Sequence, residues 1–124
     1  MQFIDLKTRH RLIEDNINAS IQKVMDHGQF ILGPEVRELE GKLAEYTGSK
    51  HCITVSSGTD SLLIALMALG VGAGDEVITV PYTWISSAEV IALLGAKPVF
   101  VDICSGTMNM NETLLESAIT DKTK

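Results

Sequence analysis

Apolar side chains recur at steps of three and four residues along the first third of the chain, which is the spacing of one helix face. They predict an amphipathic helix over residues 9–27 and a second helix that begins at Pro34. Gly28 and Gly48 are expected to end these helices, and residues 29–33 form a short apolar connector. The apolar stripe of the first helix is Ile13, Ile17, Ile21, Val24 and Met25. The stripe of the second helix, which we expect to be buried, is Val36, Leu39, Leu43 and Tyr46.

From residue 51 the pattern changes to short apolar strands that alternate with helices. The predicted strands cover 51–55, 76–80 and 97–102, and the predicted helices cover 58–70, 84–94 and a last segment capped by Asn111. Short joints and nearly all-apolar strands are typical of an α/β domain with a mostly parallel sheet flanked by helices. The helix over 58–70 is apolar nearly all round, since residues 62–69 are all hydrophobic, so we expect it to be sandwiched between other elements.

Composition and charge limit the classes of function. The 124 residues are 45% hydrophobic and 21% charged, which is typical of a single globular domain. A net charge of −6 argues against a nucleic-acid partner, because phosphate backbones need a basic face. The stretch between Lys50 and Lys97 contains no lysine or arginine. Any anion bound there must therefore be held by backbone N–H groups and hydroxyl groups.

Cysteine and signal patterns indicate a cytoplasmic protein. Cys52 and Cys104 stand alone in the sequence and fit neither a disulfide framework nor a metal site, so we expect two free thiols in a reducing compartment. The first ten residues lack the apolar region of a signal peptide, and the longest apolar run is too short to span a membrane. The glycines at 70, 72 and 74 follow a helix and open a strand, so they predict a turn and not a dinucleotide site.

The turn at residues 56–59 is the first candidate site. It leaves the carboxyl end of a predicted strand and opens a helix, where unpaired N–H groups and the helix dipole attract phosphate. Gly58 would let an anion approach the backbone, and Thr59 would add a hydroxyl donor. The alternative is a helix cap, because Ser57 followed three residues later by Asp60 is a variant of the capping box.

The second candidate is Trp84, the only tryptophan, just past the end of a predicted strand. An indole at this place can stack on an aromatic cofactor ring. The alternative is a core anchor at the start of a helix, since large aromatic side chains mostly pack inside proteins.

In this order and at this spacing, the segments resemble the DegT/DnrJ/EryC1/StrS aminotransferase family. The matching segments are FIDL (3–6), GQFILGPEV (28–36), LE (39–40), SGTDSL (57–62), LGVGAGDEVIT (69–79), YTW (82–84) and GAKPVFVD (95–102). The sequence departs from the family at Cys104 and Asn111, where aspartate is usual. The resemblance implies the N-terminal part of the fold type I large domain of enzymes that use pyridoxal 5′-phosphate (PLP).

The resemblance also implies roles for the candidate residues. Gly58, Thr59 and Asp60 would contact the cofactor phosphate, Asp60 through its backbone N–H, and Trp84 would stack on the pyridine ring. Residues 1–48 would form N-terminal helices, and residues 49–124 the start of the PLP-binding domain, within one partial domain.

The activity implied is transfer of an amino group from an amino acid such as L-glutamate to a nucleotide-linked keto sugar. The sequence is most similar to the branch that aminates a UDP-linked 3-keto sugar acid for lipopolysaccharide or other surface glycans. Family members are homodimers with active sites at the subunit interface. Small molecules, and neither nucleic acids nor membranes, are therefore the expected partners, together with a second copy of the chain.

None of the seven lysines occupies a position that matches the family's Schiff-base lysine. They are Lys7, Lys23, Lys42, Lys50, Lys97, Lys122 and Lys124. The chain alone is therefore expected to be inactive. The resemblance also implies that later strands separate the first predicted strand from the next two, so we expect the isolated chain to be either unstable or self-associated. Two alternatives stay open: a sugar dehydratase of the same family, in which histidine replaces the lysine, and a truncated, non-catalytic remnant that acts only by association.

Overall fold

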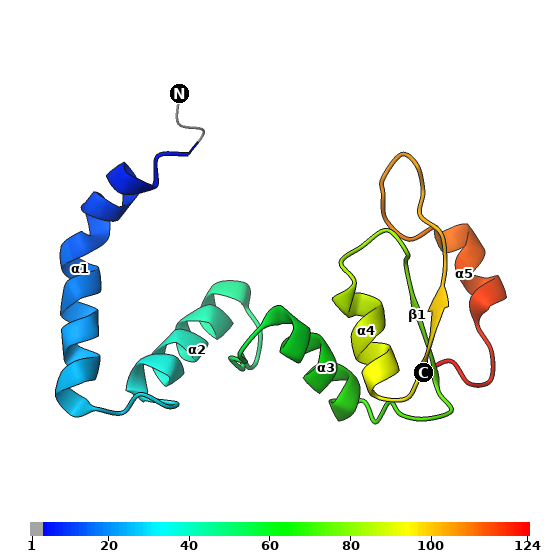
Figure 1. Cartoon of the computed structure of the whole chain (residues 1–124), viewed down its shortest axis with the longest axis horizontal. Helices are drawn as coiled ribbons and strands as arrows, with labels where there is room; N and C mark the ends of the chain where they lie inside the picture. Colours follow the sequence, from blue (N-terminus) through cyan, green and yellow to red (C-terminus); the bar gives the residue numbers. More distant parts are fainter. Residues whose placement is uncertain (1–3) are drawn as a thin grey trace. The chain divides into compact units, whose positions relative to one another are not determined.

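A computed structural model describes residues 4–124, so Phe3 of the first matching segment lies outside the described residues. The chain divides into two compact units between Thr54 and Val55. The assignment of both units to one partial domain stays a prediction. Figure 1 shows the order of the elements along the chain.

The first unit contains helices α1 (Leu6–His27) and α2 (Pro34–Thr47), which confirms both predicted helices. Helix α1 begins at Leu6 and not at residue 9, because the Asp5 side chain accepts a hydrogen bond from the Thr8 N–H at 3.0 Å and caps it. Gly28 and Gly48 end the helices in the left-handed conformation, with φ of 67° and 69°, as expected.

A polar cluster joins the end of α1 to the start of α2. The His27 Nε2 atom lies 3.2 Å from each carboxylate oxygen of Glu35, and the Lys23 ammonium lies 3.2 Å from the same carboxylate. The Gln29 N–H donates to His27 Nδ1 at 3.0 Å, so the hydrogen-bond network assigns the imidazole proton to Nε2. These contacts close the turn between the helices.

The expected burial of the apolar stripe in α2 is wrong within this unit. None of the described residues of α1 and α2 is buried, and Leu39, Leu43 and Tyr46 are exposed. Two helices and a connector do not provide the second layer against which such a stripe is normally buried.

The second unit carries a small parallel sheet. Its elements are α3 (Gly58–Ala68), β1 (Glu76–Thr79), α4 (Ser86–Leu93), β2 (Lys97–Phe100) and α5 (Glu112–Ala118). Strands β1 and β2 pair in parallel, from Glu76 opposite Lys97 to Thr79 opposite Phe100. Helix α4 connects the two strands and packs against both, which is the βαβ arrangement predicted from the alternating pattern (Figure 1). Asn111 caps α5 as expected, because its side chain accepts from the Thr113 N–H.

The predicted strand at 51–55 is wrong, and the other two strands are shorter than expected. A strand is stabilised by a backbone ladder, and within the described chain residues 51–55 pair with no other strand. The N–H of Thr54 instead donates to the Glu40 carboxylate at 2.8 Å. On β1, a parallel bridge between Glu76 and Thr123 adds a third segment at the edge away from β2.

The core of the second unit lies where α4 covers the strands. Buried Val71, Ile91 and Ala96 pack with partly buried Leu66, Val77 and Leu94. The expectation that α3 is sandwiched is wrong: none of its residues is buried, and Leu62, Ile64 and Met67 are exposed. Helix α3 packs on α4, and Leu66 reaches the core, but the exposed residues show that the other described residues of this unit do not enclose the helix.

The glycine-rich segment after α3 is a turn, as predicted. Gly70 and Gly74 have φ of 71° and 96°, a region that favours glycine, and the Gly72 N–H donates to the Asp75 carboxylate at 2.9 Å. Among residues 4–124, no helix is long and apolar enough to cross a membrane.

Candidate functional site

The start of α3 presents a capped helix end with two N–H groups that the helix itself does not use. Ser57 is the N-cap, and its Oγ accepts a hydrogen bond from the Asp60 N–H at 3.1 Å. Gly58 and Thr59 are the first two residues of the helix, so their N–H groups have no acceptor within it. A Cβ at Gly58 would meet no atom within 4 Å, which leaves open space beside this backbone.

Asp60 completes the cap and faces the preceding turn. Its carboxylate accepts hydrogen bonds from the hydroxyls of Ser56 and, at 3.0 Å, Ser57. The Ser56 hydroxyl, and then that of Ser57, lowers the pKa of Asp60, so the carboxylate is ionised near neutral pH. The capping alternative is therefore confirmed. The N–H that the resemblance assigns to a phosphate already donates to Ser57, and its contact with a phosphate stays a prediction.

Trp84 lies between β1 and α4. The predicted helix start at residue 84 is wrong: α4 begins at Ser86, and the Trp84 carbonyl only accepts from the Ser87 N–H, at 3.1 Å, ahead of the regular helix. Trp84 is 77% exposed, so the core-anchor alternative is also wrong. An exposed indole beside a helix start is available to cover a ligand ring.

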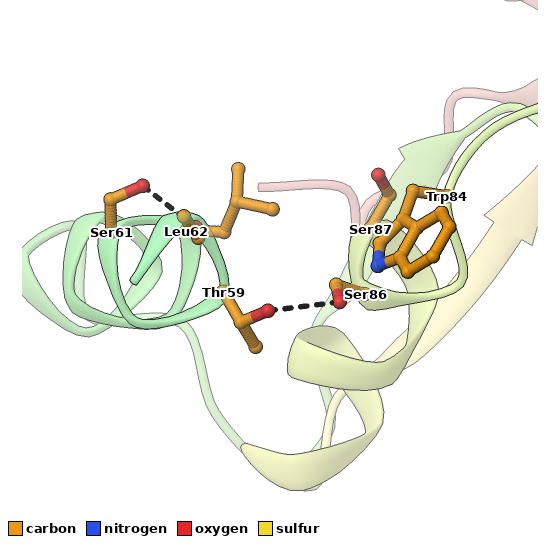
Figure 2. A pocket seen from close by; sticks show the side chains of 7 residues that line it. Thr59, Ser61, Leu62, Trp84, Ser86 and Ser87 are labelled. Carbon is orange, nitrogen blue, oxygen red and sulfur yellow. Dashed lines mark hydrogen bonds between the residues drawn. The ribbon is translucent and has the colours of Figure 1, made fainter. Parts of the chain in front are cut away.

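A pocket of about 470 Å³ brings three of the four predicted residues together. Its wall is formed by Gly58, Thr59, Ser61, Leu62, Trp84, Ser86 and Ser87, but not by Asp60. Figure 2 shows the pocket between the first turn of α3 and the start of α4, with the hydroxyls of Thr59 and Ser86 pointing toward each other. Its volume falls within the range of about 300–1,000 Å³ typical of small-molecule sites.

The chemistry of the wall agrees with the lack of basic residues in this stretch of sequence. No lysine or arginine lines the pocket, whereas two helix starts, four hydroxyls and an indole do. The Ser61 hydroxyl is already used, because it donates to the Gly58 carbonyl at 2.7 Å. Backbone N–H groups and the remaining hydroxyls can bind an anion, and the indole can cover an aromatic ring. Among the described residues, no group of three or more His, Cys, Asp or Glu side chains could hold a metal ion.

The sequence did not assign a role to the serines at the start of α4. Ser86 is buried, and its Oγ lies 3.0 Å from the Thr59 Oγ1. The signal in the sequence was a pair of serines just before an apolar helix, which by itself indicates only a helix start. Their place in the pocket depends on the packing of α3 on α4, which no local spacing reveals.

Comparison with known proteins identifies the class. The profile of the DegT/DnrJ/EryC1/StrS aminotransferase family matches residues 11–124, and the chain belongs to this family. It is 57% identical, over all of its length, to the UDP-2-acetamido-2-deoxy-3-oxo-D-glucuronate aminotransferase of Pseudomonas aeruginosa, of which it spans 34%. The chain thus covers about a third of the length of this relative.

Solved structures agree with this assignment. A DegT/DnrJ/EryC1/StrS aminotransferase from Brucella abortus is 50% identical with a TM-score of 0.89, over 96% of this chain and 32% of that one. DesV of S. venezuelae is 37% identical with a TM-score of 0.92, over 99% of this chain and 33% of that one. The chain therefore has the α/β fold of the N-terminal part of these enzymes, and aminotransferases of this family use PLP.

Proposed function

We propose that this chain is the N-terminal part of a PLP-dependent sugar aminotransferase and that it supplies one side of the cofactor site. The observation that carries the proposal is the pocket in which Gly58, Thr59 and Trp84 meet. These residues occupy the positions that the family resemblance implies for phosphate and ring contacts. They come from two separate segments of the chain that packing brings to one cavity.

The residues present fit a phosphate group. The N–H groups of Gly58 and Thr59 point out of the start of α3, where the helix dipole favours an anion. The open space at Gly58 allows close approach, and the Thr59 hydroxyl lies on the pocket wall. The Asp60 carboxylate, which would repel a phosphate, is directed toward the serine hydroxyls of the preceding turn.

The exposed indole of Trp84 fits the cofactor ring. Offset stacking of aromatic rings contributes about 0.5–1.5 kcal/mol beyond the burial of their area. Together, the helix start and the indole would fix both ends of one molecule and so orient its ring. When bound, PLP supplies an electron sink that stabilises negative charge next to the transferred amino group.

We further propose that the amino group passes from an amino acid such as L-glutamate to a nucleotide-linked keto sugar. The name and 57% identity of the P. aeruginosa relative support a UDP-linked 3-oxo sugar acid as acceptor. Synthesis of surface polysaccharide such as lipopolysaccharide, a cytoplasmic location and a homodimer belong to the same proposal. None of the pocket-lining residues is a lysine, so this wall supplies no lysine to move the proton, and we propose that these residues alone would not complete the transfer.

Binding of pyridoxamine 5′-phosphate, compared with pyridoxamine, tests the cofactor site. The amine form avoids covalent reaction of an aldehyde with surface lysines, and quenching of Trp84, the only tryptophan, reports binding. We expect tighter binding of the phosphorylated compound, and we expect Thr59→Val to reduce that preference about tenfold, because a hydrogen bond to a charged group contributes about 1.5–3 kcal/mol. Thr113 lies outside the pocket, so Thr113→Val is the control and should leave the preference unchanged. Equal binding of the two compounds would contradict the proposal.

A further inference from the structure

Ser86 is a buried residue in the wall of the pocket. Only 5% of the residue is exposed, and its Oγ lies 3.0 Å from the Oγ1 of Thr59 (Figure 2). The contact joins the first turn of α3 to the first turn of α4 across 27 positions of sequence. Among the described residues, Thr59 is the hydrogen-bond partner of the buried Ser86 side chain.

The hydroxyl of Ser86 does not cap its own helix. The N-cap of α4 is Ile85, which makes no side-chain cap hydrogen bond, and Ser86 is the first helical residue. A serine at the N-cap position usually accepts a bond from its own helix, with a stabilisation of about 1 kcal/mol, but Ser86 lies one residue beyond that position. The Ser86 side chain points across to α3, which indicates that its hydroxyl serves to hold the Thr59 side chain.

The direction of the bond decides what Thr59 can offer to a ligand. Each hydroxyl carries one proton. If Thr59 donated to Ser86, Thr59 would have no proton for an anion in the pocket. If Ser86 donates to Thr59, the Thr59 proton is free to point into the pocket, and the two bonds polarise each other. An anion on the wall formed by Thr59 favours the second arrangement, because it can only accept.

We infer that Ser86 is a positioning residue: it donates to Thr59 and holds the Thr59 hydroxyl so that its proton is directed at the cofactor phosphate. The inference rests on the proposed function, which supplies the phosphate. Although Ser86 also lines the pocket, its one hydroxyl proton is donated to Thr59 and is not offered to the phosphate. Its effect must therefore pass through Thr59 and vanish when the Thr59 hydroxyl is removed.

A double-mutant cycle on the whole chain tests this dependence. Ser86→Ala, Thr59→Val and the double variant are titrated with pyridoxamine 5′-phosphate and with pyridoxamine. We expect Ser86→Ala to weaken binding of the phosphorylated compound about fivefold, the size of an ordinary hydrogen bond, and to leave pyridoxamine binding unchanged. In the Thr59→Val background, the same substitution should have no further effect.

Ser117→Ala is the matched control, since Ser117 lies outside the pocket and its hydroxyl donates to the Leu114 carbonyl within α5. Thr59→Ser keeps the hydroxyl and should retain sensitivity to Ser86→Ala, which guards against a variant that simply misfolds. Equal weakening of both compounds by Ser86→Ala, or additive losses in the double variant, would overturn the inference while the cofactor site stands. A wild-type chain with no preference for the phosphorylated compound would overturn both.

Discussion

The carboxylate of Glu76 accepts a hydrogen bond from the Lys97 ammonium at 2.9 Å, across the first rung of the β1–β2 pair. Glu76 is buried, and its other carboxylate oxygen accepts from the Thr120 hydroxyl at 2.7 Å. Its backbone N–H and carbonyl bond to Lys122 and Lys124. One residue therefore ties β1 to β2 and to the segment after α5.

These contacts predict an acid-sensitive second unit. The hydrogen bond from Lys97, followed by that from Thr120, lowers the pKa of Glu76 from its ordinary value of 4.5. Because the folded pKa is the lower one, the stabilisation is fully present above pH 4.5 and is lost as the pH falls through the folded pKa. Glu76→Gln should lower the stability at pH 7 and flatten this dependence, as measured by thermal unfolding between pH 3 and 7.

Glu116→Gln is the matched control for that measurement, because Glu116 is exposed on α5 and forms no ion pair among the described residues. It should leave the pH dependence of the melting temperature as it is in the wild type. If Glu76→Gln and Glu116→Gln show the same dependence of melting temperature on pH, the hydrogen bond between Lys97 and Glu76 does not stabilise the second unit as the geometry indicates.

A second prediction concerns the packing of α4 on the sheet. Ile91 is 2% exposed in the core cluster, whereas Leu93, on the same helix, is 67% exposed. Ile91→Ala should lower the free energy of unfolding by about 2–5 kcal/mol, from lost burial and a new cavity. Leu93→Ala should change it by no more than about 0.5 kcal/mol. Urea unfolding followed by circular dichroism measures both, and similar losses would contradict the assignment of the core.

Local signals in the sequence predicted helix ends better than pairing or burial. Gly28, Pro34 and Asn111 act within a few residues, so their positions were readable. The strand expected at 51–55 needed a partner strand, and the apolar pattern cannot say whether one is present. The burial expected for α3 failed for the same reason, since an apolar helix is sandwiched only where a second surface covers it.

The candidate site shows the same division. Gly58, Thr59 and Trp84 could be proposed from the sequence because each lies within four residues of the end of an apolar strand-like run, and the structure brings them to one pocket. Ser86 was not found as part of the site, because its relation to Thr59 exists only after α3 packs on α4. Asp60 was correctly predicted to take part in the cap. The sequence could not show where its carboxylate points relative to an expected phosphate, because that depends on its hydrogen bonds to the two serines.

A third prediction concerns two glycines of the first unit: Gly33, just before α2, and Gly41, inside α2. A Cβ added at Gly33 would collide with the carbonyl oxygen of Gln29, whereas a Cβ at Gly41, inside α2, would meet no atom within 4 Å. Gly33→Ala should destabilise the first unit by about 1–3 kcal/mol, because backbone must shift to admit the methyl group. Gly41→Ala should stabilise it by about 0.5–1 kcal/mol through helix propensity. Opposite signs in urea unfolding are expected, and a stabilising Gly33→Ala would contradict the close approach.

The last prediction separates the two roles of Asp60. Its negative charge suits the start of α3 but opposes an anion bound there. Asp60→Asn keeps an oxygen acceptor for the serine hydroxyls and leaves the backbone bond to Ser57 in place. We therefore expect pyridoxamine 5′-phosphate to bind about two- to fivefold more tightly, the size of a charge effect at a helix start. Pyridoxamine should bind as before.

Salt distinguishes a charge effect from a change in shape. The Debye length falls from about 10 Å at 0.1 M to about 3 Å at 1 M ionic strength. The gain from Asp60→Asn should therefore shrink at high salt, whereas the loss from Thr59→Val, which removes a direct hydrogen bond, should persist. If Asp60→Asn instead binds the phosphorylated compound more weakly, the expected repulsion is not the main effect of Asp60. The ionised carboxylate would then support the phosphate site by holding the hydroxyls of Ser56 and Ser57 in place.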